Sequence, residues 1–216
     1  MAIDKPPGWM LAPVSWQKTQ RNLQAAIESA VAAGDFWASS RNLKFLRHVH
    51  RLDAETSGIL LFAKSQGAME TFSKLFESRK MEKVYLAVVI GRPKESEWVS
   101  RLKLATNPRR PGRMKVDRFG GKDSETRFRA LETRGKFSLV EARPITGRTH
   151  QIRVHLAEDG VPVAGDTLYG NQAGDLPMAL RAVELVYMDP FTKRRVEIHA
   201  PVEQFLEEFG FGPNRF

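Results

Sequence analysis

The chain has 216 residues, 42% of them hydrophobic and 27% charged, which is ordinary for a globular protein and enough for one domain with a good core. Its 34 Lys and Arg outnumber its 25 Asp and Glu, and the formal charge of +9 favours a polyanionic partner, most often nucleic acid. The absence of cysteine excludes disulfides, thiolate metal sites and a cysteine nucleophile. No apolar run could cross a bilayer, and Pro-Pro-Gly at 6–8 is unlike a signal peptide, so we expect a cytoplasmic protein.

Two amphipathic helices are predicted in the N-terminal part of the chain. Residues 19–33 place small and apolar side chains on one face, and Gly34 is a typical stop. The second helix runs from Ser65, its expected N-cap, to Lys80. Its predicted buried stripe consists of Met69, Phe72 and Phe76. Between the two helices, the uncharged residues 58–63 predict a strand covered on both faces.

Most of the remaining chain favours strands. Residues 83–91 predict a central strand, because apolar side chains lie on both of its faces. Residues 94–135 are charged and Gly-rich but contain short alternating pieces, which predict antiparallel strands with long loops. Further strands are predicted at 137–145, 183–187 and 194–200.

Two more helices are expected, one from Thr149 to Ala157, ended by Gly160, and a short one near 203–209. Strands and helices do not alternate regularly. This order predicts the α+β class, with a single domain over residues 1–216 and a mixed, mostly antiparallel sheet flanked by helices and loops.

Asp53 lies five residues before the predicted buried strand. A carboxylate there is costly to desolvate unless a neighbour pairs with it or the protein uses it. Taken alone, Asp-x-x-Thr-Ser-Gly is a turn sequence whose side chains bond the local backbone. Arg51, two residues earlier, is long enough to pair with the carboxylate or to reach a phosphate, or it forms an ordinary surface salt bridge. These residues therefore leave two interpretations of Asp53 open, a chemical role and a structural role in the turn.

A second basic segment, from Gly147 to Arg153, opens the helix predicted after it. Thr149 is the expected N-cap, and the free N–H groups of a helix start attract anions. His150 and Arg153 share one side of the helix, and Ile152 lies on an adjacent apolar side. An Arg in a cleft would keep a half-buried aspartate ionised. A solvated basic helix end is the alternative.

The sequence predicts neither a metal site nor a nucleotide cofactor. His150 and His155 are five residues apart on one helix, and no nearby Cys or acid completes a ligand set. No Gly-x-Ser-x-Gly elbow supports a Ser-His-Asp triad. Phosphate-binding Gly-x-x-x-x-Gly-Lys-Ser/Thr and Gly-x-Gly-x-x-Gly sequences are also missing.

Two long motifs resemble the signatures of one enzyme family. HRLDAETSG (50–58), followed by ILLFAKS, and TGRTHQIRVHL (146–156) closely resemble the main motifs of the RluA-type pseudouridine synthases. Weaker matches occur in order along the chain: DKPPGW (4–9), KVYLAVVIG (83–91), GKDSETRF (121–128), VPVAGDTLYG (161–170) and ELVYMDPFTKRRVEIHAP (184–201). The resemblance covers nearly the whole chain, and it implies the pseudouridine synthase fold.

The resemblance implies a reaction that needs no cofactor. The C–N glycosidic bond of an RNA uridine is broken, the uracil is turned, and C5 is joined to the sugar carbon. Asp53 would act at the ribose, either attacking the anomeric carbon or taking a proton from C2′. Arg153 would pair with Asp53 and hold it ionised. Tyr85 would stack on the uracil, for which ordinary core packing is the alternative, and Ile152 would belong to the apolar wall around the base.

Structured RNA, ribosomal or transfer, is the implied partner. The target base must leave its stack to reach such a pocket, and Arg51 is the candidate to occupy the vacated space. We expect a monomer that finds RNA with its own surface, because there is no room for the S4-type module that many relatives carry. Further RNA contacts are predicted from the two motifs and the loop NPRRPGRMK, namely His50, Arg148, His150, Ile152, Arg109, Arg110, Arg113 and Lys115.

The chain also departs from the family pattern. Arg181 stands where the family usually has His, and the stretch at 15–42 is longer than expected between the first two motifs. Two rival functions stay open. One is an RNA-binding module of the same fold without catalysis, and the other is a glycosidic hydrolase that uses two carboxylates. The candidate pairs for the hydrolase are Asp53 with Glu55 and Asp53 with Asp166.

Overall fold

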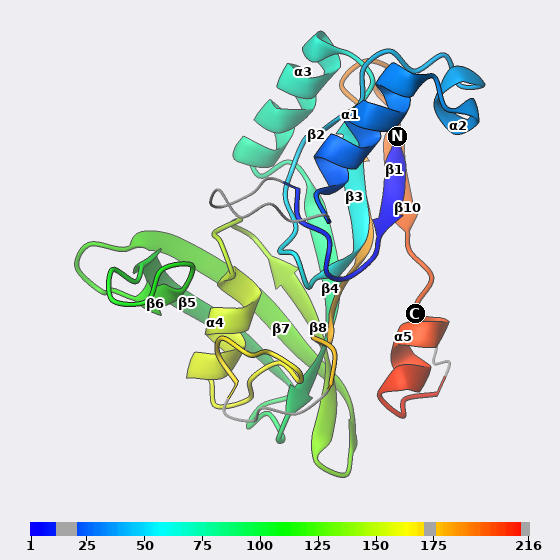
Figure 1. The fold of residues 1–216 in the computed structure, drawn as a ribbon. Helices are drawn as coiled ribbons and strands as arrows, with labels where there is room; N and C mark the ends of the chain where they lie inside the picture. The colour runs from blue at the N-terminus through cyan, green and yellow to red at the C-terminus, as the bar shows by residue number, and fades with distance from the viewer. Residues whose placement is uncertain (12–20, 171–175, 213–216) are drawn as a thin grey trace. The chain divides into compact units, whose positions relative to one another are not determined.

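A computed structural model describes residues 1–11, 21–170 and 176–212 of the chain (Figure 1). By its internal contacts the chain divides into two compact units. The first consists of Met1–Met81 and Val186–Ile198, and the second of Glu82–Leu185 with the residues from His199 onwards. The bulk of the second unit is therefore inserted into the sequence of the first.

The strands of the first unit centre on β3 (Ser57–Ala63), the predicted two-faced strand, all of which is buried except Ser57. β1 (Ala2–Lys5) and the short β2 (Arg47–His48) both pair with β3 in antiparallel orientation. The C-terminal part of β9 (Leu180–Met188) and nearly all of β10 (Arg195–His199) belong to the same unit, and these two strands pair with each other.

Three helices belong to the first unit: α1 (Leu23–Ala33), the short α2 (Phe36–Ser39) and α3 (Gln66–Glu77). The helix predicted over 19–33 begins only at Leu23, because the Asn22 side chain caps it by accepting a 3.1 Å hydrogen bond from the Ala25 N–H. Its predicted end is confirmed, since Gly34 adopts the left-handed conformation of a C-cap. Residues 12–20 lie outside the described residues.

The prediction for α3 is confirmed at its start and wrong in two details. The Ser65 hydroxyl accepts a hydrogen bond from the Ala68 N–H at 3.3 Å, as an N-cap should, but the helix ends at Glu77 instead of Lys80. None of its residues is fully buried. The predicted apolar stripe is half-buried, with Phe72 edge-on to Tyr187 at 5.5 Å between ring centroids.

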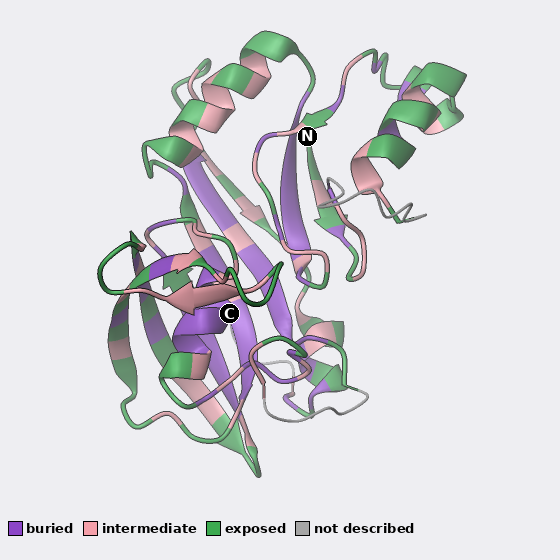
Figure 2. Ribbon diagram, turned by 60° about the vertical axis from the view of Figure 1, so that its left-hand side comes forward, coloured by how far each residue is buried: buried purple, intermediate pink, exposed green. Residues whose placement is uncertain are grey.

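The second unit has strands in the order β9-β4-β8-β7-β5-β6. The pairs β4–β8, β8–β7, β7–β5 and β5–β6 are all antiparallel. These strands are β4 (Glu82–Ile90), β5 (Glu97–Thr106), β6 (Met114–Val116), β7 (Lys122–Arg134) and β8 (Phe137–Pro144). β4 is an interior strand with β9 on one side and β8 on the other, in agreement with its prediction as a two-faced strand, and Val88 and Val89 are fully buried. Figure 2 shows buried residues following the middle strands.

The core of the second unit lies between this sheet and two helices, α4 (Gln151–Glu158) and α5 (Glu203–Glu208). Ile152 and Leu156 of α4 and Leu206 of α5 pack with residues of β4 and β8 in one buried cluster. The predicted α+β class with a mostly antiparallel sheet is therefore confirmed. That residues 1–216 act as a single domain stays a prediction.

Among the helices that the structure describes, none combines the length and the apolar character needed to span a membrane.

His155 of α4 is a buried histidine whose ring is only partly satisfied by hydrogen bonds. The side chain is completely buried, and its Nε2 lies 2.8 Å from the Ser124 hydroxyl, which in turn donates to the Leu102 carbonyl at 2.6 Å. Since the hydroxyl proton is used on Leu102, Nε2 carries the imidazole proton. Nδ1 is buried without a hydrogen-bond partner among the described residues. Burial lowers the pKa of His155 to about 4.

This burial predicts a specific acid sensitivity. The unfolded chain takes up the His155 proton near pH 6.5, whereas the folded chain takes it up near pH 4, so stability falls as the pH drops between these values. The loss amounts to at most about 3.5 kcal/mol, because the two pKa values differ by about 2.5 and each pKa unit corresponds to about 1.4 kcal/mol. Urea unfolding of His155→Gln should show a shallower pH dependence from 6.5 to 4 than the original protein. The matched control is Ser40→Gln, which places the same amide at an exposed position without removing a titratable group and should keep the original slope.

Candidate active site

Asp53 lies in the turn that leads into β3, and its side chain is half-buried. The Asp53 carbonyl accepts a 3.2 Å hydrogen bond from the N–H of Thr56, a residue that is itself buried. Glu55, the neighbouring carboxylate, is exposed. The predicted turn is therefore present, and it holds one carboxylate close to the protein interior and another in solvent.

A buried lysine fixes this turn. Lys5, at the end of β1, lies opposite Gly58 in the strand register and has no exposed surface. Its ammonium donates to the carbonyls of Ala54 at 2.7 Å, Pro6 at 2.9 Å and Trp9 at 3.0 Å. The Gly8 N–H donates to the same Ala54 carbonyl at 2.9 Å. The loop of the first motif is thus bonded to the residue next to Asp53.

The charge of Lys5 is balanced locally. Burial lowers the pKa of Lys5 to about 8, and the negative charges of Glu55 and Asp53 act in the opposite direction. A buried ammonium normally needs such partners, because carbonyl dipoles alone only partly replace its hydration. The turn is therefore bonded to the buried ammonium of Lys5, and it carries the half-buried carboxylate of Asp53.

The residues just before Asp53 have different surroundings. His50, predicted to contact RNA, accepts a 3.0 Å hydrogen bond at Nε2 from the Leu61 N–H and stacks on Phe76 with ring centroids 4.4 Å apart. Both contacts hold the segment against β3 and α3. Arg51 is exposed, as its predicted contact with RNA requires.

The start of α4 differs from the prediction. The helix begins at Gln151, and the residue before it is His150, with a φ of 54°, instead of the predicted cap Thr149. The reason is the Gln151 side chain, whose Oε1 accepts hydrogen bonds from the Thr146 hydroxyl at 2.6 Å and the Arg148 N–H at 3.0 Å. These bonds close the loop from Thr146 to Gln151, and the helix therefore begins after His150 without a cap from Thr149.

Gln151 also connects this loop to β7. Its Nε2 donates to the Glu125 carbonyl and to the Thr126 hydroxyl, both at 2.9 Å. Arg148, another predicted RNA contact, donates from Nε to the Asp123 carbonyl at 3.0 Å. One buried amide therefore satisfies four polar groups and sets the direction of α4.

Arg153 is buried in α4 and forms an ion pair within the same unit. Its Nε and Nη2 donate to the two carboxylate oxygens of Asp166 at 2.7 and 2.8 Å, a bidentate arrangement. The N–H groups of Leu168 and Tyr169 donate to the same carboxylate at 2.9 and 3.1 Å. Burial alone would raise the pKa of Asp166, but Arg153 and these N–H groups hold it below its ordinary value.

Tyr169 joins α4 to the basic loop. Its hydroxyl accepts a 2.7 Å hydrogen bond from the Met114 N–H and lies 2.9 Å from Nδ1 of His150. The guanidinium carbons of Arg113 and Arg153 lie 5.0 and 5.2 Å from its ring centroid. Tyr169 therefore contacts three of the residues that the sequence singled out.

β4 supplies two half-buried polar side chains on one face. Tyr85, the predicted uracil-stacking residue, lies opposite Ala142 of β8 and packs partly against the core. Lys83, two residues earlier, points to the same face of the strand. Its Nζ would lie 3.8 Å from a Cβ placed on Gly147, next to the loop that precedes α4. Burial lowers the pKa of Lys83 to about 8.

The four basic residues predicted in the loop after β5 divide into two pairs. Arg109 and Arg110 are exposed. Arg113 lies over Tyr169, and Lys115 forms an ion pair with Asp117 at 3.0 Å. Two of these cations are therefore held by internal contacts and two extend into solvent.

Asp53 belongs to the first unit, whereas Tyr85, Ile152 and Arg153 belong to the second. Sequence reasoning missed Lys5, Lys83, Gln151 and Tyr169, although each lies inside a motif that it quoted. Asp166 was considered only as a second carboxylate. Among the described residues, no three His, Cys, Asp or Glu side chains gather as a metal site would require.

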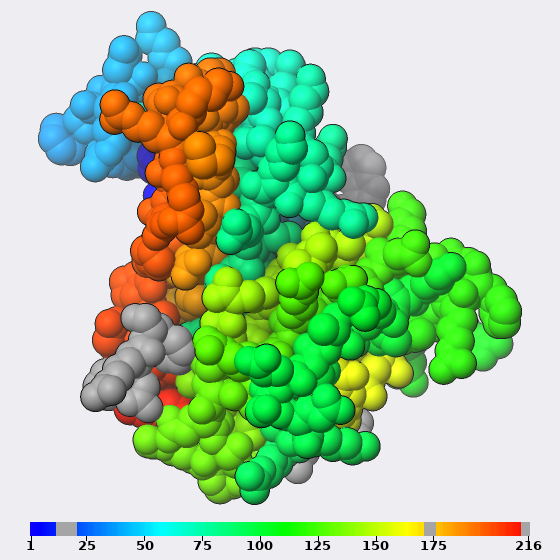
Figure 3. Space-filling view, turned by 180° about the vertical axis from the view of Figure 1, so that it is seen from behind, coloured from blue at the N-terminus to red at the C-terminus, as the bar shows by residue number. Residues whose placement is uncertain are grey.

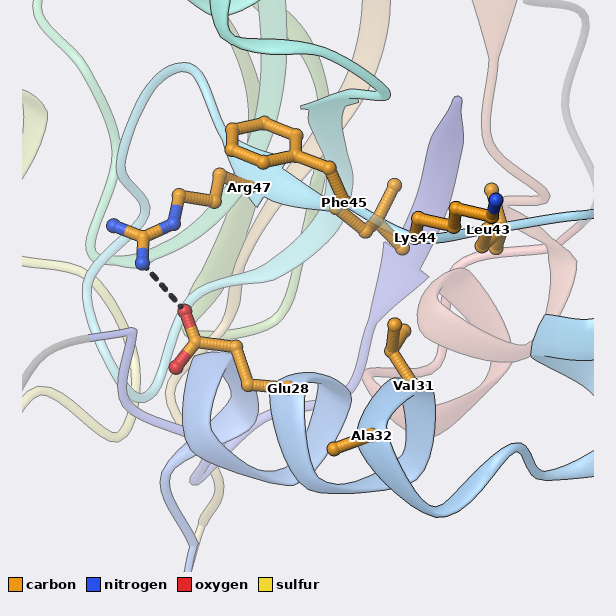
Figure 4. A pocket seen from close by; sticks show the side chains of 8 residues that line it. Glu28, Val31, Ala32, Leu43, Lys44, Phe45 and Arg47 are labelled. Carbon is orange, nitrogen blue, oxygen red and sulfur yellow. Dashed lines mark ion pairs between the residues drawn. The ribbon is translucent and has the colours of Figure 1, made fainter.

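A separate pocket of about 400 Å³ lies beside α1 in the first unit (Figure 4). The Glu28–Arg47 ion pair, at 3.3 Å, crosses one side of it. The apolar part of its lining includes Val31, Ala32, Leu43, Phe45 and Leu46. None of the predicted site residues lines this pocket.

Comparison with known structures identifies the class of fold. A human protein named RNA pseudouridylate synthase domain containing 1 matches with a TM-score of 0.73 and 28% identity, over 93% of this chain and 78% of that one. The human protein named RNA pseudouridylate synthase domain containing 4 matches with a TM-score of 0.77 and 22% identity, over 96% and 87%. The fold is that of the pseudouridylate synthases.

The sequence gives the family directly. The model of the RNA pseudouridylate synthase family matches residues 1–158, and the chain belongs to this family. The ribosomal large subunit pseudouridine synthase C of Vibrio cholerae is 39% identical over 176 residues, which are 76% of this chain and 54% of that protein. An uncharacterized RNA pseudouridine synthase of Chloroflexus aurantiacus is 40% identical over 162 residues, 74% of this chain and 51% of that protein. The chain thus spans about half the length of these relatives, and the resemblance to the RluA-type family is confirmed.

The Arg153–Asp166 pair makes a stability prediction. Asp166→Asn removes the carboxylate charge that pairs with the buried Arg153 guanidinium, so the free energy of unfolding should fall by about 3–5 kcal/mol in urea titrations. The control is Asp159→Asn, because Asp159 is exposed and accepts a hydrogen bond from the Trp98 ring N–H at 2.9 Å. A loss of the same size in both variants would contradict a special role for the ion pair.

Lys5 makes a second, local prediction. Lys5→Met removes the ammonium donor from three carbonyls, of which the Ala54 carbonyl keeps the Gly8 N–H, and we expect the free energy of unfolding to drop by roughly 3 kcal/mol. Hydrogen exchange at the Gly8 and Thr56 amides should accelerate as well, since both bonds close the turn around Asp53. Lys80→Met, at an exposed position, serves as the control. Unchanged exchange at Gly8 and Thr56 in Lys5→Met would contradict the proposed support.

Proposed function

We propose that the chain is a pseudouridine synthase that isomerises uridines in structured RNA, with Asp53 acting at the ribose. The C1′–N1 bond breaks, the uracil turns while it stays bound, and C1′ bonds to C5. The C5 proton leaves and N1 gains a proton, so the reaction balances without a cofactor or a redox change. One observation carries the proposal: in a chain of this family, the motif aspartate sits half-buried on a turn that buried Lys5 holds in place.

In this proposal the two units act as one catalytic domain, and the second unit supplies Arg153 and Tyr85. Arg153 pairs with Asp53 and keeps it ionised, since a nearby cation opposes the effect of desolvation. A guanidinium has five N–H donors, more than the two that Asp166 takes, so one arginine can serve two carboxylates. Tyr85 stacks on the uracil from the half-buried face of β4, beside Lys83.

RNA is the substrate class that the charge distribution supports. Exposed Arg51, Arg109 and Arg110 are available to contact phosphate groups, and such contacts weaken as salt rises. Arg51 takes the place of the flipped base. We propose ribosomal RNA as the first candidate, because the Vibrio cholerae relative is named for the large ribosomal subunit. The protein acts as a monomer in the cytoplasm in this proposal.

The geometry argues against one form of the rival hydrolase. An inverting or retaining glycosidase needs a second carboxyl group that can hold and release a proton. Asp166 is buried, and its carboxylate accepts four hydrogen bonds, two of them from Arg153, which keeps its pKa low. Asp166 therefore serves as a fixed counter-ion.

Tritium release from RNA labelled at C5 of uridine tests the proposal. The protein should release label into water from ribosomal or transfer RNA, and Asp53→Asn should lower the rate by at least about a thousandfold. Glu55→Gln removes the neighbouring, exposed carboxylate and should leave the rate within about threefold, which makes it the matched control.

Two outcomes would contradict the proposal. Full tritium release by Asp53→Asn would remove the aspartate from the mechanism. Release of free uracil instead of its retention in the RNA would indicate the hydrolase. RNA binding without release of either label or base, from both RNA pools, would indicate the non-catalytic binding module.

A further inference from the structure

The segment from Arg101 to Lys122 is the most one-sided in charge near the candidate site. It contains eight Lys or Arg and one acidic residue, Asp117. The segment comprises the second half of β5, the loop with Arg109 and Arg110, β6, and the turn before β7. Figure 3 shows the loops of this region projecting at the right-hand edge of the molecule. Its charge is complementary to a polyanion.

An aromatic side chain is exposed within this basic segment. Phe119 is 98% exposed, more than any other large hydrophobic residue in the described part of the chain. Single exposed apolar residues are common on protein surfaces, so exposure by itself indicates nothing. What distinguishes Phe119 is that its backbone is tightly held, as the turn around it shows.

Asp117 builds that turn. One of its carboxylate oxygens, Oδ1, accepts hydrogen bonds from the Phe119 N–H at 3.2 Å and the Gly120 N–H at 2.9 Å. Its carbonyl accepts from the Gly121 N–H at 3.0 Å, and its own N–H donates to Lys103 of β5 at 2.8 Å. The only acid of the segment is thus used to fix the backbone on which the aromatic ring stands.

Gly121 shows how closely the turn packs on β5. A Cβ at this position would lie 2.5 Å from the Asp117 carbonyl oxygen and 2.7 Å from the Lys103 carbonyl carbon. Both are backbone atoms that cannot move aside, so only glycine fits. The turn is therefore held on two sides, by the Asp117 carboxylate and by β5, while Phe119 itself contacts solvent.

We infer that Phe119 is a stacking platform for an unpaired RNA base outside the catalytic site. An exposed aromatic ring on a fixed backbone, among cations, is a combination that single-stranded nucleic acid binds, because the cations hold the phosphates and the ring stacks on a base of any sequence. The inference rests on the proposed function for its assignment of RNA as ligand.

Two fluorescent probes of about twelve nucleotides separate stacking from charge. One is an oligoadenylate, and the other has the same backbone with stable abasic residues in place of every base. Phe119→Ala should weaken binding of the oligoadenylate by roughly five- to hundredfold and leave binding of the abasic probe unchanged. Phe119→Tyr should restore the oligoadenylate affinity. The matched control is Phe36→Ala, since Phe36 is 85% exposed in the first unit and follows an acid, Asp35.

Asp117→Ala gives a second test, because charge and stacking predict different changes in the binding of the two probes. The substitution removes a negative charge, so electrostatics predicts tighter binding of both probes. If the turn positions Phe119, the advantage of oligoadenylate over the abasic probe should shrink at the same time. An unchanged advantage would show that the turn does not position the ring.

The outcomes separate this inference from the proposed function. Equal effects of Phe119→Ala on both probes, or no effect on either, overturn the inference even if tritium release from uridine-labelled RNA proceeds normally. Failure of the original protein to bind the oligoadenylate also overturns it. Base-dependent loss in Phe119→Ala, in a protein that releases no tritium, supports the stacking platform and contradicts the synthase.

Discussion

The ammonium of Lys5 is the interaction on which the candidate site depends. Three backbone carbonyls from two distant segments converge on it, and one of them belongs to the residue next to Asp53. Burying a cation in this way is expensive, and it is tolerated because the carbonyls and nearby carboxylates replace the lost water. In return the first motif and the aspartate turn become a single rigid piece.

The second unit also contains a buried ion that positions its neighbours, but here the ion is an anion. Asp166 is the buried anion, and its oxygens collect two guanidinium hydrogen bonds and two backbone N–H groups. This fixes Arg153, and through Tyr169 the same network reaches His150 and the loop that carries Arg113. Each unit thus uses a buried ion to position its functional side chain. The partners of these ions are backbone groups or a guanidinium that binds with two hydrogen bonds, and both kinds of contact leave little rotational freedom.

Much of this structure could be predicted from local sequence patterns. The two-faced strand β3, the Ser65 cap and the Gly34 stop depend on neighbours only a few residues away, and all three are correct. The start of α4 was mispredicted because the choice between Thr149 and His150 is made by Gln151, whose partners in β7 are about twenty-five residues distant. Helix propensity carries no information about such a contact.

The same limit applies to the buried ions. Lysine is almost always exposed, so nothing in the composition marks Lys5 as a core residue. The Arg153–Asp166 pair links α4 to a loop, and a pattern search over the helix alone cannot find its partner. Asp53, by contrast, could be singled out from the sequence, because a carboxylate beside an uncharged strand conflicts with ordinary burial, while its proposed role comes from the family resemblance.

The division of the chain has a consequence for its synthesis on the ribosome. The first unit needs residues 186–198 to supply the end of β9 and most of β10, whereas residues 82–185 already contain all the strands of the antiparallel set from β4 to β8. Chains are made from the N-terminus, and compact units form as soon as their residues have emerged. The inserted unit therefore assembles its sheet while the unit that begins the chain is still waiting for its last strands. Residues 1–81 spend that interval without β9, the strand that lies next to β3 in the folded chain, and so carry an open strand edge to which another strand could add.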